Sequence, residues 1–225
     1  VAKWTVITKL MIMTDSFTSP ERLLAKTEPP VSLDTHLEAV STHAASLIDS
    51  PAVSRVLNAQ LTDESLDRET LVGLADLAGR LHDTGKAHPD WQDGAREAIE
   101  SSTASTRLPP HSGRSALYAF AYLRSESPSS IDSRLKLDAV LLAVLHHHTP
   151  LTAEHMAPDR RPPVDVFGFD SGTQHVMPDA LSAAGFPSVD IPPETVDSLS
   201  NAVIAARKHK TNYDTPTLGV ATTLL

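Results

Sequence analysis

Apolar residues recur at helical spacing in several separate stretches of the chain. The clearest of these stretches has an apolar face made of Leu71, Leu74, Ala75, Ala78 and Leu81. Spacings of three and four residues are typical of one buried helix face, and Gly85 is expected to end this helix. An earlier helix is expected to begin at Ser32 or Asp34, either of which can cap it, and to be interrupted at Pro51.

Three more helices are expected further along the chain, at about 111–124, 131–148 and 194–210. A loop rich in Ser, Thr and Pro at 101–110 precedes the first of them, and Pro150 stops the second. One face of the last helix comprises Val196, Leu199, Val203 and Ala206. We find no internal repeat and no alternating strand pattern, so we predict an all-α fold.

Residues 157–193 contain seven of the chain's 17 prolines, which excludes a long helix there. We therefore predict an irregular, proline-rich insertion within a single domain that spans 23–225. Residues 1–22 are expected to form an N-terminal extension, because Val1–Ile12 show no helical pattern. Leu218–Leu225 looks like the start of an apolar helix, so the last helix of the domain is expected to be truncated.

The composition narrows the class of protein. A chain of 225 residues with 40% hydrophobic residues can form one substantial core. The formal net charge of −9 argues against a protein that binds nucleic acid through a broadly basic surface. Cysteine is absent, which excludes disulfides and thiolate metal sites, and no apolar run is long enough to span a bilayer. We therefore expect a cytoplasmic protein that does not associate with a membrane.

Histidine is the residue type that stands out, with 11 in the chain. His82 and Asp83 are adjacent at the end of an apolar helix, where both can bind one cation and the carboxylate can bridge two. His36, His111 and the run 146–148 also lie at or near helix ends. Four helices could thus each bring an imidazole to one place, which would form a di-metal pocket inside a helical bundle.

These residues also have simpler interpretations. A lone histidine on an apolar face is more often a hydrogen-bonded core residue than a ligand, and three in a row can form a polar helix end. The remaining histidines are interpreted as structural, namely His43, His88, His155, His175 and His209. Lys86 could bind phosphate or serve only as a helix-end charge. A phosphate loop is excluded, because Arg80 stands where its first glycine would be needed.

Five motifs follow one another along the chain: Leu23-Leu-Ala-Lys26, Leu33-x-x-His36-Leu37-x-x-Val40, His82-Asp-x-Gly-Lys86 with Trp91-Gln92, His111-Ser-Gly-x-Ser115-Ala116, and Ala143-Val-Leu-His-His-His-Thr-Pro-Leu151. In type and order they resemble the HD nuclease domain of the CRISPR type I interference helicase-nuclease, a member of the HD phosphohydrolase superfamily. The resemblance covers about residues 23–151.

The resemblance implies a helical HD bundle that cleaves single-stranded DNA with two divalent ions. Asp83 would bridge the two ions and act with Lys86 in catalysis, and Lys86 and Ser115 would contact the substrate. A site rich in histidine suits manganese, iron, cobalt or nickel better than magnesium, which prefers oxygen ligands. The implied partners are a helicase subunit or domain and the RNA-guided interference complex.

The resemblance also implies a set of metal ligands. Besides Asp83, these would be His36 and His82 for one ion and His111, His147 and His148 for the other. The choice within the triple histidine rests on alignment with the leucine that follows it, and His146 is the alternative. The family also uses a final aspartate, for which Asp214 is the nearest candidate.

Two other functions fit part of the sequence. An HD nucleotidase or cyclic-nucleotide phosphodiesterase would have a similar motif core, although Trp91-Gln92 and the Leu-Ala-Lys opening would then go unexplained. An inactive HD domain could instead bind metal and serve as a docking module for the interference complex. Detectable turnover of small phosphate esters without DNA cleavage would favour the former function. Bound metal without turnover would favour the latter.

Overall fold

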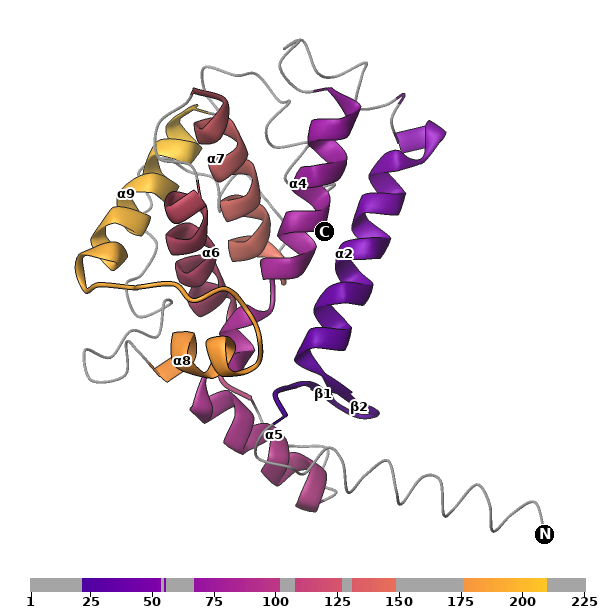
Figure 1. Cartoon of the computed structure of the whole chain (residues 1–225), viewed down its shortest axis with the longest axis vertical. Helices are drawn as coiled ribbons and strands as arrows, with labels where there is room; N and C mark the ends of the chain where they lie inside the picture. The colour runs from indigo at the N-terminus through magenta and orange to yellow at the C-terminus, as the bar shows by residue number, and fades with distance from the viewer. Residues whose placement is uncertain are drawn as a thin grey trace, which may run out of the picture.

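Helices follow the predicted apolar stretches in the computed structural model, which describes residues 22–53, 55, 67–101, 108–126, 131–148 and 176–209 (Figure 1). The helices are α2 (Leu33–Asp49), α4 (Arg68–Leu81), η1 (Thr84–Ala87), α5 (Pro89–Ser101), α6 (Ser112–Glu126), α7 (Ile131–His146), α8 (Val176–Ala183) and α9 (Glu194–His209). Two short strands, β1 (Leu24–Thr27) and β2 (Pro30–Ser32), form an antiparallel hairpin. The predicted all-α fold is confirmed, with this hairpin as a small addition.

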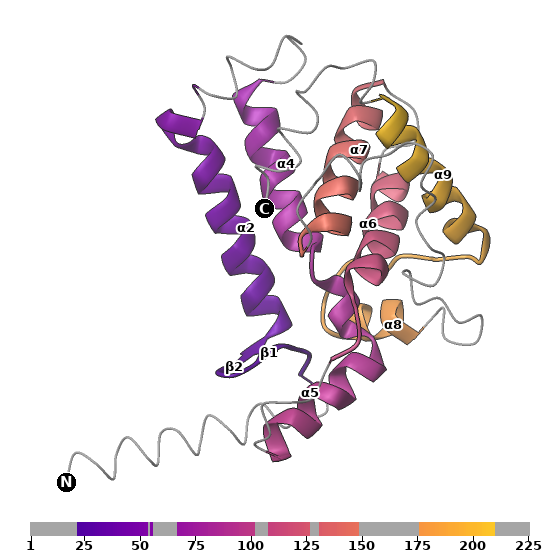
Figure 2. The same ribbon diagram turned by 180° about the vertical axis from the view of Figure 1, so that it is seen from behind.

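Helix α4 lies between α2 on one side and α7 on the other, while α6 and α9 complete the far side (Figures 1 and 2). The contact between α2 and α4 is close because residue 79 is a glycine. A Cβ atom on Gly79 would lie 2.5 Å from the Cα atom of Ser41, which is backbone and cannot rotate away. The two helices can therefore pack backbone against backbone and bring their lower ends, with His36 and His82, together.

The core is filled mostly by small and branched aliphatic side chains. Residues 139–145 of α7 are buried without interruption, so this helix is enclosed on all sides along its last two turns. The four residues that were predicted to form one face of α9 are all buried. None of the helices in the described part of the chain is both long and apolar enough to cross a membrane.

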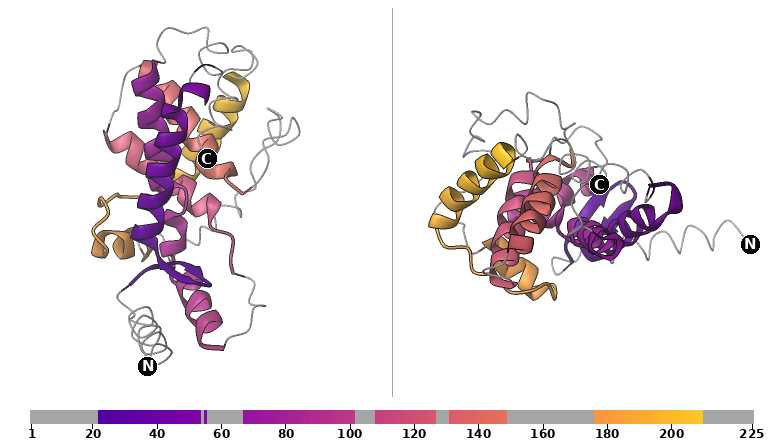
Figure 3. Two further views of the ribbon diagram at one scale, coloured as in Figure 1. Left: turned by 90° about the vertical axis from the view of Figure 1, so that its right-hand side faces the viewer. Right: turned by 90° about the horizontal axis from the view of Figure 1, so that it is seen from above.

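Helix α5 was not expected from the sequence. It lies beyond the end of the bundle, next to the β1–β2 hairpin (Figure 3). Pro89 occupies its first position, where the missing N–H costs nothing, and the helix buries only Trp91, Gln92 and Ala95. So few buried positions give a weak apolar pattern in a stretch that is otherwise polar.

The predicted insertion at 157–193 contains one short helix in its described part, residues 176–193, and no long one there. Residues 157–175 lie outside the described part, but Val176–Ala183 forms α8. Pro178 is compatible with this helix because it lies in the first turn, where backbone N–H groups have no partner within the helix. The expected extension before Arg22 and the expected truncated helix at 218–225 also lie outside the described residues.

Candidate metal centre

Asp83 occupies the junction between α4 and η1. His82 is the C-cap of α4, and the next residue, Asp83, precedes the single turn of η1. Two hydrogen bonds fold this junction tightly, from the Thr84 hydroxyl to the Leu81 carbonyl (2.9 Å) and from the Lys86 N–H to the Asp83 carbonyl (2.9 Å). The Asp83 side chain is only 2% exposed, so the chain delivers a carboxylate into the interior.

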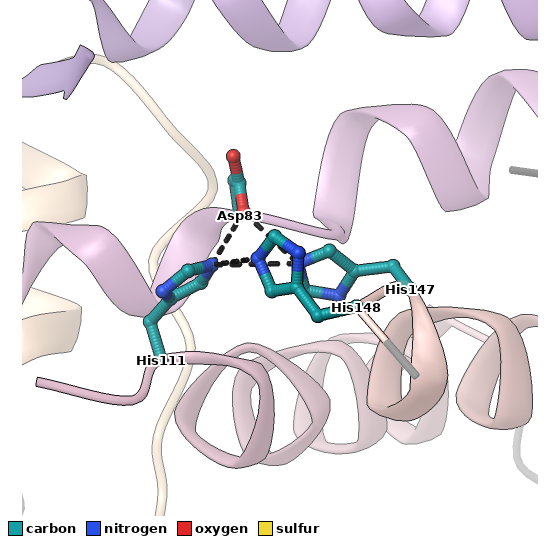
Figure 4. A group of neighbouring side chains, drawn as sticks. All are labelled: Asp83, His111, His147 and His148. Carbon is teal, nitrogen blue, oxygen red and sulfur yellow. Dashed lines mark hydrogen bonds and ion pairs between the residues drawn. The ribbon is translucent and has the colours of Figure 1, made fainter. Parts of the chain in front are cut away.

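The two carboxylate oxygens of Asp83 face different imidazoles. Oδ2 lies 2.9 Å from Nε2 of His36 and 3.2 Å from Nε2 of His82. Oδ1 lies 2.8 Å from Nε2 of His111 and 3.2 Å from Nε2 of His147 (Figure 4). Asp83 thus stands between two groups of ring nitrogens. One group comes from α2 and the end of α4, and the other from the residues just before α6 and just after α7.

His148 joins the group on the Oδ1 side. Its Nε2 lies 3.0 Å from Nε2 of His111, and Nε2 of His147 lies 3.3 Å from the same atom (Figure 4). Within the described residues, the donor atoms form two sets whose members all lie within 4.8 Å of one another: Asp83, His111, His147 and His148; and His36, His82 and Asp83. His146 belongs to neither set.

Backbone carbonyls fix the orientation of two of the rings. Nδ1 of His82 lies 2.8 Å from the carbonyl oxygen of Gly79, and Nδ1 of His147 lies 2.7 Å from that of Val144. A carbonyl can only accept, so each Nδ1 carries the proton and donates it. This leaves Nε2 of each ring, the atom nearest Asp83, as the one that a metal ion would bind.

The electrostatics keep Asp83 charged and two of the imidazoles neutral. Burial alone would raise the pKa of Asp83, but the four surrounding imidazoles outweigh burial and hold this pKa far below its ordinary value. Burial lowers the pKa of His111, although Asp83 partly offsets this effect. Burial and the neighbouring imidazoles lower the pKa of His148 to about 4. Near pH 7 the site therefore combines an ionised carboxylate with neutral imidazoles that can bind metal.

Hydrogen bonding alone does not satisfy these donor atoms. Asp83 Oδ1 is buried and receives no well-directed hydrogen bond from the described residues, despite its two close ring nitrogens. Nε2 of His111 faces Nε2 of His147, Nε2 of His148 and Oδ1 of Asp83, and a single proton on that atom can serve only one of the three. A cation at their centre would remove the conflict, so the residues fit a divalent metal with nitrogen and carboxylate ligands.

Lys86 lies beside the same carboxylate. Its ammonium group donates to Oδ2 of Asp83 (2.7 Å) and to the carbonyl of Ala25 in β1 (3.0 Å), and it lies 5.2 Å from the centre of the Trp91 ring. The side chain is 10% exposed. Lys86 thus already binds the Asp83 carboxylate and the β1 strand. Its predicted contact with substrate would be made from this position.

Ser115, which was predicted to contact substrate, is completely buried. Its hydroxyl accepts a hydrogen bond from the N–H of Gly85 (2.8 Å). This bond fastens η1 to the first turn of α6, the helix that follows His111. In this structure Ser115 is therefore a supporting residue, whose hydrogen bond fixes the distance between Asp83 and His111.

Gln92 has a structural role that the sequence did not reveal. Its side-chain amide accepts from the N–H of Leu24 (2.8 Å) and donates to the carbonyls of Leu24 (2.9 Å) and Lys86 (2.7 Å). It thereby joins β1 to η1 and is 2% exposed. The only signal in the sequence was its place in the Trp91-Gln92 motif, which says nothing about long-range partners.

The other histidines lie apart from the site or outside the described part of the chain. His43 is exposed, and His88 is buried at the start of α5, where its Nδ1 accepts from the N–H of Asp90 (3.2 Å). Neither belongs to the two donor sets. The side chains of His155, His175 and His209 lie outside the described part of the structure, and so does the predicted ligand Asp214.

Comparison with known proteins gives one match. The model of the family described as "Cas3, HD domain" matches residues 24–207, a span that includes every member of both donor sets. No curated protein and no solved structure matches the chain.

Proposed function

The chain belongs to the Cas3 HD-domain family, and on this premise we propose that it is a metal-dependent nuclease that cleaves single-stranded DNA in CRISPR type I interference. The observation that carries the proposal is the position of Asp83, with one oxygen directed at each of two histidine groups. This is the arrangement that two ions sharing one carboxylate would need.

Two ions are proposed, with Asp83 as their shared ligand. His36 and His82 would hold one ion, and His111, His147 and His148 the other. Manganese, iron, cobalt or nickel suits these nitrogen-rich sets better than magnesium. Such a pair of ions supplies an activated water at neutral pH and stabilises the charge that develops on the phosphate.

The residues of the chain prepare the site for that chemistry. Asp83 stays ionised because the imidazoles around it lower its pKa, and Lys86 holds one of its oxygens from the side of the hairpin. Lys86 would also place a positive charge near the phosphate. Gln92 and Ser115 keep η1 at its distance from β1 and α6, so that the two donor sets face each other.

The proposed substrate also requires partners. A surface with net charge −9 does not attract DNA over a broad area, so we propose that a helicase subunit or domain and an RNA-guided complex deliver the single strand. A cytoplasmic location is expected for such an assembly.

Cleavage of circular single-stranded DNA tests the proposal. The protein is assayed with manganese, nickel or magnesium, beside Asp83→Asn and the control Asp93→Asn, which changes an exposed carboxylate on α5. We expect cleavage with a transition metal, its loss by about 100-fold or more in Asp83→Asn, and no change in the control.

The other outcomes are informative. Hydrolysis of nucleotides or cyclic nucleotides without DNA cleavage would replace the proposal with a small-substrate phosphohydrolase. Bound metal without turnover on any phosphodiester would indicate a docking module. Equal rates for wild type and Asp83→Asn would contradict the metal site itself.

A further inference from the structure

A cavity of about 530 Å³ adjoins the candidate metal centre at His111, His148 and Lys86. Its lining comes from β1 and Glu28, from residues 108–112 at the start of α6, and from Lys86, Trp91 and His148. His36 and His82 are not among its lining residues. The cavity thus meets the site at the histidines on the side of Asp83 Oδ1, where His148 is exposed.

The cavity has a basic residue available at its edge. Lys26 is exposed and lines the cavity, and its side chain makes no hydrogen bond or ion pair with the described residues. Glu28 lies on the same edge, and Lys86 lines the inner end with its ammonium group on Asp83. Lys26 is thus the lysine here whose charge is not already used within the protein.

Another part of the lining is apolar. It consists of Leu108, Pro109 and Pro110, all partly exposed or exposed. Trp91 also lines the cavity; it is 2% exposed, and its ring packs nearly perpendicular to that of His111. A groove with an apolar wall and a basic edge matches the way proteins bind single-stranded nucleic acid, in which one surface packs on the base or sugar and a cation meets the phosphate.

The volume of the cavity suits one nucleotide of a single DNA strand. Sites for small ligands span about 300–1,000 Å³, a range that includes the volume of this cavity and the size of one nucleotide. We propose that the groove holds the nucleotide next to the scissile phosphate of a single DNA strand, with Lys26 bound to the flanking phosphate. The inference rests on the proposed nuclease function and adds to it the position of the strand beside the site.

Two opposite changes of charge at the edge of the cavity test whether it binds single-stranded DNA. Lys26→Glu removes the cation, and Glu28→Lys adds one beside it. Arg55→Glu and Glu69→Lys make the same changes in charge at exposed positions, beyond the far end of α2 and at the start of α4. Binding of a fluorescent deoxythymidine 12-mer to the manganese-loaded protein is measured by anisotropy at 4 °C, and the oligomer is checked for integrity on a gel.

We expect Lys26→Glu to raise Kd about 5-fold and Glu28→Lys to lower it, with little change in either control. The slope of log Kd against log salt should fall by about 0.7 in Lys26→Glu, as one lost phosphate contact on a single strand predicts. In cleavage assays the same variant should raise KM more than it lowers kcat.

The binding readout separates this inference from the nuclease proposal. A strand that binds with the expected charge dependence but is never cut would support the groove and contradict the nuclease function. Equal shifts in the groove variants and their matched controls would overturn the groove, even if DNA is cleaved. Absence of measurable binding by the wild-type protein would overturn it as well.

Discussion

Gly85 and His111 lie so close together that residue 85 can carry no side chain. A Cβ atom there would be 2.2 Å from the His111 carbonyl oxygen and 2.7 Å from the Ser115 nitrogen, and both are backbone atoms. The turn that follows Asp83 is thus pressed against the first turn of α6. This contact brings the carboxylate within reach of the His111 ring.

Gly85→Ala should therefore destabilise the protein. Because α6 would have to move, we expect the free energy of unfolding to fall by about 2 kcal/mol or more, together with metal affinity. Urea denaturation measures the first quantity and calorimetric metal titration the second. Gly73→Ala is the matched control, since a Cβ at that position in α4 meets no atom within 4 Å. It should stabilise the protein by about 0.5–1 kcal/mol.

Gln92→Leu should loosen the hairpin from η1. The substitution keeps most of the volume but leaves the N–H and carbonyl of Leu24 and the carbonyl of Lys86 without their partner. We expect a loss of about 3 kcal/mol in the free energy of unfolding. Faster amide exchange at Leu24 is the specific readout. Asp93→Leu, at the next residue, is the control. Because Asp93 is exposed, this change should lower the free energy of unfolding by less than about 0.5 kcal/mol.

The metal content of variants can show which residues of the triple histidine bind metal. His148 contributes to the donor set around Asp83 Oδ1, whereas His146 does not. His148→Ala should weaken binding of one metal ion by about 10-fold or more, and His146→Ala should leave the metal content unchanged. Elemental analysis after dialysis against manganese measures both. A larger loss in His146→Ala would transfer the ligand role to that residue.

His88 should make the protein sensitive to acid. Burial and the nearby Arg114 lower the pKa of His88 below its ordinary value of 6.5. The unfolded chain therefore binds the proton first as the pH falls. The contribution of His88 to stability is fully present above about pH 6.5 and is lost below it, toward the lowered folded-state pKa.

The test compares wild type with His88→Gln, both kept metal-free with EDTA. The melting temperature of the wild type should fall more between pH 7.5 and pH 5 than that of the variant. The comparison is needed because the lowered pKa values of His111 and His148 act in the same direction. Parallel pH profiles would show that His88 does not contribute.

Much of the fold could be predicted because most long helices have a periodic apolar face and α7 contains a continuous apolar run. The four buried positions of α9 are one example. The hairpin could not be predicted, since strands of four and three residues are too short for alternation to appear. Helix α5 was missed because it depends on contacts with β1 and η1, and such contacts leave little local pattern.

Part of the candidate site could likewise be predicted from the sequence, and part could not. Helix ends indicated which histidines could meet, and the family motifs supported Asp83 as their centre. The roles of Gln92 and Ser115 depend on hydrogen bonds across 68 and 30 residues of sequence, and no local pattern encodes them. The division of the Asp83 oxygens between two groups likewise depends on how α2, α6 and α7 converge.

The donor atoms around Asp83 come from segments that the unfolded chain would scatter: α2, the end of α4, the start of α6 and the end of α7. An ion held there would act as a cross-link between them, and it would bind only the folded chain. At a free metal concentration of 100 times Kd, this linkage adds about 2.7 kcal/mol to stability. The melting temperature would then report metal supply, and scarcity of the metal would reduce the amount of folded protein as well as its activity.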